Sequence, residues 1–283
     1  MEALVWGCRG SLASPGAATV RYGGNTSCVE VRLDDGAVLV LDAGTGVREL
    51  GRTLVGHNGP IHMLLTHLHL DHVEGLGFFA PFWESGAELH LWGPGSPLHT
   101  LEQRISRFVS PPLFPLQVSD SPAELHFHDL PGGAWQIGGA TIGAGEVLHP
   151  GPTVGYRIEE GGMSLAYIPD HEPALALDGG FERVSSDWLP GFDIAAGATV
   201  LLHDAQLTEE EYAARVGWGH SSVDDAVAFA RSAGVERLVL FHHDPMRGDD
   251  DVERLATYAQ SLWPGANGSS PQPAYEGMKL SLQ

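Results

Sequence analysis

The segment Thr66-His67-Leu68-His69-Leu70-Asp71-His72 places three imidazoles and one carboxylate within six residues. It continues the apolar run from Ile61 to Thr66, which predicts a buried strand. Side-chain direction repeats every two residues in an extended chain, so His67 and His69 are expected on the same side. Imidazole and carboxylate suit zinc, manganese or iron better than calcium. The segment therefore predicts a metal site. The alternative is a polar loop whose histidines cap backbone groups.

Further polar residues follow other apolar runs, at the point where each predicted strand ends. Sites in layered α/β proteins gather at strand ends and adjoining loops, so residues from this set can complete the site, with a structural role favoured for His203. They are His149 after Leu148, Asp170 after Ile168, His203 and Asp204 after Leu202, and His242 after Phe241.

The remaining pattern predicts an α/β (α+β) protein with two mixed sheets and outer helices. Continuous apolarity in Val38–Leu41 indicates a strand covered on both faces. Helices are expected at 47–54, 98–108, 208–215, 222–232 and 249–263, and short strands at 3–7, 28–33, 61–66, 88–92, 125–130, 135–137, 140–148, 153–158, 164–168, 199–202 and 237–241. No repeat or long linker interrupts the chain, so residues 1–283 are expected to form one domain. Whether residues 78–120 act as a lid is left open.

Composition restricts the class of partner. The chain has 283 residues, with 36 acidic against 15 basic side chains, a formal charge of −21. Such a surface repels polyanions, so neither a long nucleic acid nor a membrane is expected as a partner. No run approaches the ~20 apolar residues of a membrane span, and the first residues lack a basic secretory pattern. We expect a cytoplasmic protein. Cys8 and Cys28 are too few for a disulfide framework.

The motif His67-x-His69-x-Asp71-His72 resembles the signature of metallo-β-lactamase-fold hydrolases. Within that superfamily the chain is most similar to the phosphodiesterase branch, which includes tRNase Z and the cyclic phosphodiesterase PhnP. The segments Trp6–Ser11, Arg21–Cys28 and Arg237–His242 carry that closer resemblance. It implies a four-layer αββα sandwich of two mixed β-sheets with outer helices.

The resemblance also implies the metal ligands. Two divalent transition-metal ions are expected, with zinc preferred and manganese or iron as alternatives. The first ion would take His67, His69 and His149; the second would take Asp71, His72 and His242; Asp170 would bridge both. His243 is the alternative to His242 as the last ligand. Asp42 resembles a supporting carboxylate, with a simple loop cap as the other reading.

Two further residues match a catalytic pair of the phosphodiesterase branch. His220, just before a predicted helix, would contact phosphate or protonate the leaving group, and Asp204 would fix its tautomer. Asp71 would in addition orient a metal-activated hydroxide. The alternative is that His220 belongs to an ordinary loop preceding a helix. Arg9 and Arg21 are cations that a phosphate site would find useful, although the sequence does not place them there.

The predicted function is a dinuclear metal-dependent phosphodiesterase acting on a small or cyclic phosphodiester. A basic arm for clamping tRNA is not apparent. Lactone or other ester hydrolysis is the alternative enzyme reading, and a non-catalytic metal-binding module is the third. The oligomeric state is open, with a homodimer as one option. The other histidines show no ligand spacing to the motif and are expected on the surface or in packing, namely His57, His62, His90, His99, His126 and His128.

Overall fold

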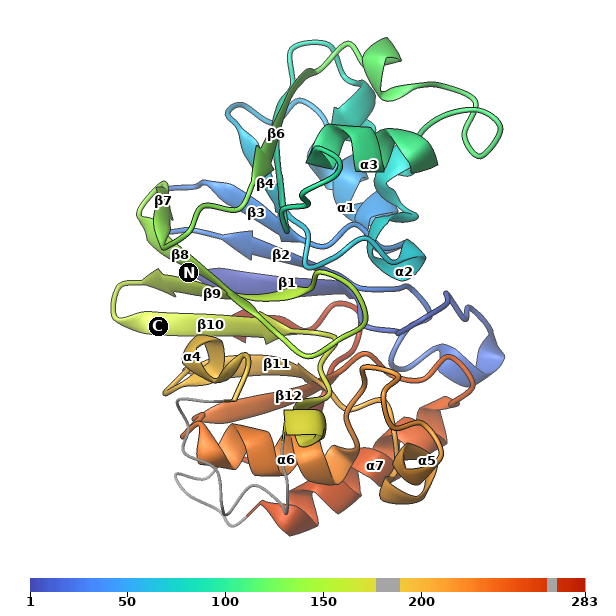
Figure 1. The fold of residues 1–283 in the computed structure, drawn as a ribbon, viewed down its shortest axis with the longest axis vertical. Coiled ribbons are helices and arrows are strands. Elements are labelled where there is room, and N and C mark those ends of the chain that lie inside the picture. Colours follow the sequence, from blue (N-terminus) through green and yellow to red (C-terminus); the bar gives the residue numbers. More distant parts are fainter. Residues whose placement is uncertain (177–188, 264–268, 283) are drawn as a thin grey trace.

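Two β-sheets lie face to face between outer helices in the computed structural model (Figure 1). It describes residues 1–176, 189–263 and 269–282. The first sheet has the strand order β14-β1-β2-β3-β4-β5-β6, and the second has the order β13-β12-β11-β10-β9-β8-β7. Both sheets mix parallel and antiparallel pairs, as predicted.

The strands of the first sheet are β14 (Lys279–Ser281), β1 (Glu2–Gly7), β2 (Cys28–Arg32), β3 (Val38–Leu41), β4 (Ile61–Leu64), β5 (Glu88–Gly93) and β6 (Glu124–Asp129). Those of the second are β13 (Gln272–Pro273), β12 (Arg237–Phe241), β11 (Val200–Asp204), β10 (Met163–Ile168), β9 (Val154–Glu160), β8 (Ala140–Glu146) and β7 (Trp135–Ile137). The helices are α1 (Val47–Thr53), α2 (Leu70–Val73), α3 (Leu101–Phe108), α4 (Phe192–Ala195), α5 (Glu209–Ala213), α6 (Val223–Ser232) and α7 (Asp249–Leu262), with 3₁₀ turns η1 (Ala17–Thr19), η2 (Leu76–Phe78), η3 (Ala80–Trp83), η4 (Val118–Asp120) and η5 (Pro173–Ala176).

Three hydrophobic cores separate the four layers. One lies between the sheets and includes Val5, Leu41 and Tyr167. A second packs the first sheet against α1 and α3, and a third packs the second sheet against α4, α6 and α7. Burying apolar side chains on both sides of each sheet is the main stabilising term for such a sandwich. The predicted αββα architecture is confirmed.

The local patterns explain why these segments form these elements. All four residues of β3 are buried, which confirms a strand covered on both faces. Thr100 forms a capping box at the start of α3, and Ser222 accepts a hydrogen bond from Asp225 N at the start of α6. The short strands β13 and β14 were not predicted. The strand β14 pairs with β1, which lies at the opposite end of the chain.

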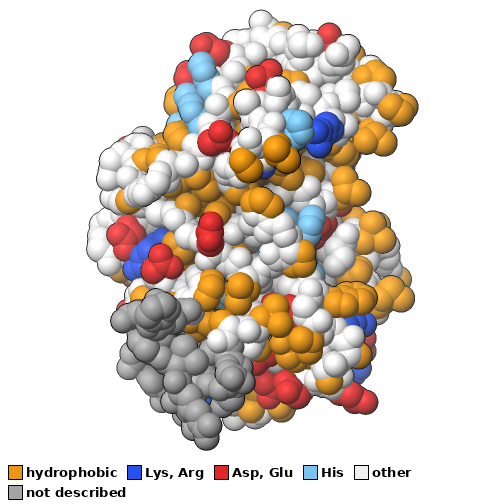
Figure 2. All heavy atoms as spheres, in the orientation of Figure 1, with side chains coloured by type: hydrophobic (Ala, Val, Ile, Leu, Met, Phe, Trp, Pro, Cys, Tyr) orange, Lys and Arg blue, Asp and Glu red, His pale blue; other side chains and the backbone are white. Residues whose placement is uncertain are grey.

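The segment Phe78–Asp120 forms part of the fold. It contributes β5 to the first sheet, and its apolar residues Phe82, Leu101 and Val109 lie in the core beneath α3. Acidic side chains form small separate groups on the visible face of the molecule, with few basic ones among them (Figure 2). Among the described helices, none is long and apolar enough to cross a membrane.

Candidate metal centre

The predicted ligands lie where several strands end at the same edge of the sandwich. His67 and His69 follow β4, His149 follows β8, Asp170 follows β10, and His242 follows β12. The strands β10, β11 and β12 are mutually parallel, so their carboxyl ends meet. The fold therefore brings together side chains that are far apart in sequence.

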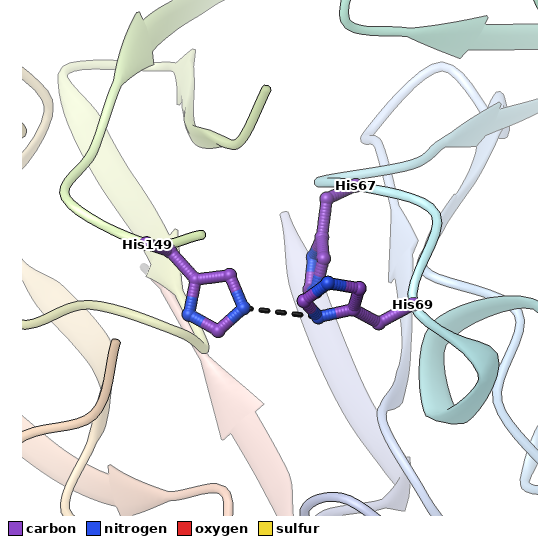
Figure 3. A group of neighbouring side chains, drawn as sticks. All are labelled: His67, His69 and His149. Carbon is purple, nitrogen blue, oxygen red and sulfur yellow. Dashed lines mark hydrogen bonds between the residues drawn. The ribbon is translucent and has the colours of Figure 1, made fainter. Parts of the chain in front are cut away.

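His149, which follows β8 of the second sheet, faces His67 and His69, which follow β4 of the first sheet (Figure 3). Their ligand atoms lie within 4.8 Å of one another, and His149 Nε2 is 3.0 Å from His69 Nδ1. Zinc–nitrogen bonds of about 2.0–2.1 Å place tetrahedral ligand atoms roughly 3.3 Å apart. His149 Nδ1 donates to Gly219 O at 2.8 Å, which leaves the lone pair of Nε2 available for a metal ion. The cluster therefore has the donor chemistry of a zinc site.

Asp71, His72 and His242 form a second group, also within 4.8 Å. Asp71 Oδ2 lies 3.3 Å from His72 Nε2 and 3.2 Å from His242 Nε2. Asp170 lies between the two groups: its Oδ2 is 3.0 Å from His72 Nε2, and its Oδ1 is 3.2 Å from His242 Nε2 and 3.9 Å from His149 Nε2. This is the position that a bridging carboxylate requires.

His242 and His243 point in different directions. His242 faces Asp71 and Asp170, whereas His243 Nε2 donates to Ala274 O at 2.9 Å, away from the cluster. The backbone of His242 has φ = 59°, a left-handed conformation that is costly for a non-glycine residue. The contacts of the two imidazoles therefore favour His242 over His243 as the ligand.

Buried donor atoms in both groups show that the residues fit a bound cation. Within the described part of the chain, His67 Nε2, His72 Nε2 and Asp170 Oδ2 are buried and have no hydrogen-bond partner. Unpartnered buried polar atoms are rare and costly in native proteins. His72 Nδ1 donates to Asp42 Oδ2 at 2.8 Å, and His72 Nε2 faces the carboxylates of Asp71 and Asp170. Divalent cations between these atoms would satisfy all of them.

The pKa directions agree with a site that attracts cations. Burial, and then the nearby His72, hold the pKa of His67 well below its ordinary value, so its imidazole is neutral. Burial also acts to lower the pKa of His72, but Asp170, Asp71 and Asp42 outweigh it and raise that pKa well above normal. The negative charge of these carboxylates therefore favours a cation beside His72 Nε2.

Asp42 holds the imidazole of His72 in place. It is fully buried with φ = 58°, and it accepts hydrogen bonds from Thr66 N at 2.7 Å, Tyr167 OH at 3.0 Å and His72 Nδ1. Ligating histidines are commonly oriented by such a carboxylate. The contacts favour the supporting role of Asp42 over a simple loop cap.

His220 and Asp204 are paired beside the metal ligands. His220 Nδ1 donates to Asp204 Oδ2 at 2.8 Å, and Asp204 is fully buried at the end of β11. The His220 ring stacks on His242 at 5.0 Å. Burial works against its charge, but Asp204 raises the pKa of His220 to about 9. His220 therefore holds a proton near the predicted reacting centre at neutral pH.

Two residues of the N-terminal loop also build the site, although their sequence carried no ligand signal. Ser11, with φ = 60°, donates its backbone N–H to Asp71 Oδ2 at 2.6 Å. A Cβ on Gly10 would lie 2.3 Å from His242 Nδ1. The close approach of this loop to His242 therefore requires glycine.

Gly10→Ala is expected to displace His242, to reduce metal content, and to lower kcat/KM by about 10–100-fold, as changes around metal ligands usually do. Elemental analysis and steady-state kinetics measure both effects. Gly16→Ala is the matched control, because a Cβ there meets nothing within 4 Å. Equal activity of the two variants would show that the placement of His242 does not depend on a glycine at residue 10.

Glu172 holds the loop that carries His220. This fully buried carboxylate accepts hydrogen bonds from Gly217 N at 2.7 Å, Gly219 N at 2.6 Å and Tyr212 OH at 3.0 Å. Gly219 in turn anchors His149. Nothing in the local sequence indicated this role, because the donors lie 40 to 47 residues away.

Glu172→Gln places an amide N–H group against backbone donors, so one of them loses its acceptor. We expect the free energy of unfolding to fall by about 1–3 kcal/mol and turnover to fall as His149 and His220 shift. Urea unfolding and kinetics test this, with Glu210→Gln on the exposed face of α5 as the control. A Glu172→Gln protein with wild-type stability and activity would contradict the role.

The arginines of the N-terminal loop have other partners. Arg9 is buried and donates to the carbonyls of Gly23 and Arg247. Arg21 pairs with Asp250 and Glu253 on α7. Neither supplies the phosphate contact considered from the sequence. His171 and His203 are buried behind Asp204 and lie within hydrogen-bond distance of each other at 3.0 Å.

Comparison with known proteins gives the family. Residues 38–243 match the model of the beta-lactamase superfamily domain, so the chain belongs to that superfamily. Ribonuclease Z of Mycobacterium bovis is 30% identical over 247 residues, covering 80% of this chain and 82% of that protein. A diphosphatase of the PhnP family superposes with a TM-score of 0.67 at 18% identity, covering 100% of this chain and 98% of that one. Human tRNase Z, short form, gives 0.66 at 18%, covering 100% of both. The predicted class, a metal-dependent hydrolase of the metallo-β-lactamase fold, is confirmed.

The expectation that excluded a long nucleic acid is wrong. Similar proteins are named ribonuclease Z and tRNase Z, enzymes whose names specify RNA. The formal charge of −21 is a sum over the whole chain and does not describe the potential at the site. Divalent cations held at this site would dominate the local field, so an acidic chain could still attract a polyanion there.

Proposed function

We propose that this protein is a phosphodiesterase that uses two divalent metal ions. The observation that carries the proposal is Asp170, whose two oxygens reach the ligands of both groups. One ion would be held by His67, His69 and His149, and the other by Asp71, His72 and His242. Neutral imidazoles with carboxylates favour zinc, with manganese and iron as alternatives.

When bound, two such cations would neutralise the negative charge that develops on a phosphodiester during displacement. The chain's own residues contribute the rest. The backbone N–H of Ser11 holds the Asp71 carboxylate in place, and this carboxylate can accept a hydrogen bond from an attacking water. His220 Nε2–H can bind a phosphate oxygen or give its proton to the leaving oxygen, while Asp204 fixes its Nδ1–H tautomer.

The His220–Asp204 pair resembles the catalytic pair of the phosphodiesterase branch, and this resemblance favours phosphodiester over lactone chemistry. For the size of the substrate there are two candidates. A small or cyclic phosphodiester is compact enough to be held by the metal centre alone. RNA is favoured by the similarity to ribonuclease Z. The two free, buried cysteines are consistent with our proposal of a cytoplasmic location.

A substrate panel tests the proposal: bis-p-nitrophenyl phosphate, 2′,3′- and 3′,5′-cyclic nucleotides, a tRNA precursor and an acyl-homoserine lactone. We expect turnover of phosphodiesters that a chelator abolishes and added zinc restores. Turnover of the lactone with no activity on any phosphodiester would overturn the proposal. The relative rates on cyclic nucleotides and the tRNA precursor decide between the two substrate classes.

A further inference from the structure

A second group of histidines lies outside the centre described above, on strands β4, β5 and β6. His62, His90 and His126 are direct neighbours in the register of these parallel strands. Paired residues of parallel strands point to the same face of a sheet. Their rings accordingly stack, with centroids 4.8 Å apart for His62–His90 and 4.5 Å apart for His90–His126.

Carboxylates accompany this row of imidazoles. Glu88 Oε1 lies 2.9 Å from His90 Nε2, and Glu124 Oε1 lies 3.2 Å from His126 Nε2. His128 Nε2 lies 3.0 Å from His90 Nδ1. Figure 2 shows histidine side chains gathered beside acidic ones at the upper left of the molecule. The group shares no residue with the first metal centre.

The register also sets Glu88 directly opposite Glu124 on the neighbouring strand. Like charges in this position destabilise a strand pair, and the chain is already strongly acidic. β6 is the edge strand of the first sheet, so β5 is the only strand of this sheet to which it is hydrogen-bonded. A cation between the two strands would remove this repulsion and link β6 to β5.

We propose that Glu88, His90 and His126 bind a third divalent transition-metal ion. We expect this ion to be zinc. The ligand atoms of these three residues lie within 4.8 Å of one another. The side chains of His90, His126 and Glu88 are 20%, 35% and 44% exposed, so an ion can enter from solvent and retain water in its remaining position. Two imidazoles and one carboxylate with an open position form a well-known zinc ligand set.

The test is equilibrium dialysis of the metal-loaded protein against increasing zinc, with zinc per chain measured by elemental analysis. Wild-type protein is expected to bind one ion per chain more than His126→Ala or His90→Ala at the same free zinc. Glu88→Gln preserves the shape of an exposed side chain but removes one charged ligand. The free zinc concentration that half-fills the site is therefore expected to rise about tenfold or more in this variant. His57→Ala is the matched control and should equal wild type.

Thermal unfolding gives a second readout. Zinc added to the loaded protein should raise the Tm of wild type and His57→Ala more than that of the three site variants, because only the former gain an ion in the folded state. Equal zinc content and equal Tm shifts in all proteins would overturn the proposal. If an alanine variant fails to fold, Glu88→Gln decides alone. The comparison is a difference between variants, so its outcome is independent of the number of ions at the first centre.

Discussion

Asp170→Ala is expected to lower kcat/KM for bis-p-nitrophenyl phosphate by about 10³-fold or more, since a bound metal contributes several kcal/mol to the transition state. Asp170 is the carboxylate that approaches both ligand groups, with Oδ2 3.0 Å from His72 Nε2 in the second group and Oδ1 3.9 Å from His149 Nε2 in the first. Its removal leaves these imidazoles without the shared anion, so bound metal should be lost as well.

Kinetics and elemental analysis of the same preparation separate the two effects. Asp193→Ala, on the exposed surface of α4, is the control and should retain both metal and activity. An Asp170→Ala protein with wild-type metal content and turnover would show that Asp170 does not join the two ligand groups.

His220→Ala is expected to lower kcat by about 10²–10⁴-fold, the usual contribution of a positioned acid, with metal content unchanged. The loss should be larger for a nucleotide diester than for bis-p-nitrophenyl phosphate. An alkoxide leaving group needs a proton, whereas p-nitrophenolate leaves readily without one. A role in binding phosphate alone would give equal losses for both substrates. If metal is lost instead, His220 has been assigned wrongly.

The pH profile provides the matching signature. The pKa of His220 is raised to about 9, so the proton that it donates is present at neutral pH and is lost as pH rises through that pKa. Wild-type kcat should therefore fall on the alkaline side, at or below pH 9, because bound cations would lower the pKa of His220. Asp204→Asn should move this fall to lower pH, and His220→Ala should remove it.

Residues close together in sequence could be predicted from the sequence, and this is why His67, His69 and His72 were identifiable from one segment. The strand-end pattern and the family resemblance together predicted His149, Asp170 and His242. Spacing in the sequence does not identify them, because their approach to the histidine motif depends on how the two sheets pack. Gly10 and Glu172 could not be found in this way. Their contacts join loops far apart in the chain, and neither residue type signals a metal site by itself.

The histidines of β4, β5 and β6 illustrate the same limit. His62, His90 and His126 are separated by about thirty residues along the chain, so no spacing rule connects them. The parallel register alone makes them neighbours. The prediction from net charge was wrong for a related reason, because a total of −21 does not say where the charges lie. It excluded long nucleic acids, although similar proteins are named ribonuclease Z.

Metal content is the most direct test of the dinuclear centre. It is best measured in His126→Ala protein, where the proposed site on β5 and β6 is removed. We predict close to two zinc, manganese or iron ions per chain, and activity that disappears when both are removed. A stably folded preparation that hydrolyses phosphodiesters with fewer than one ion per chain would contradict the existence of this centre.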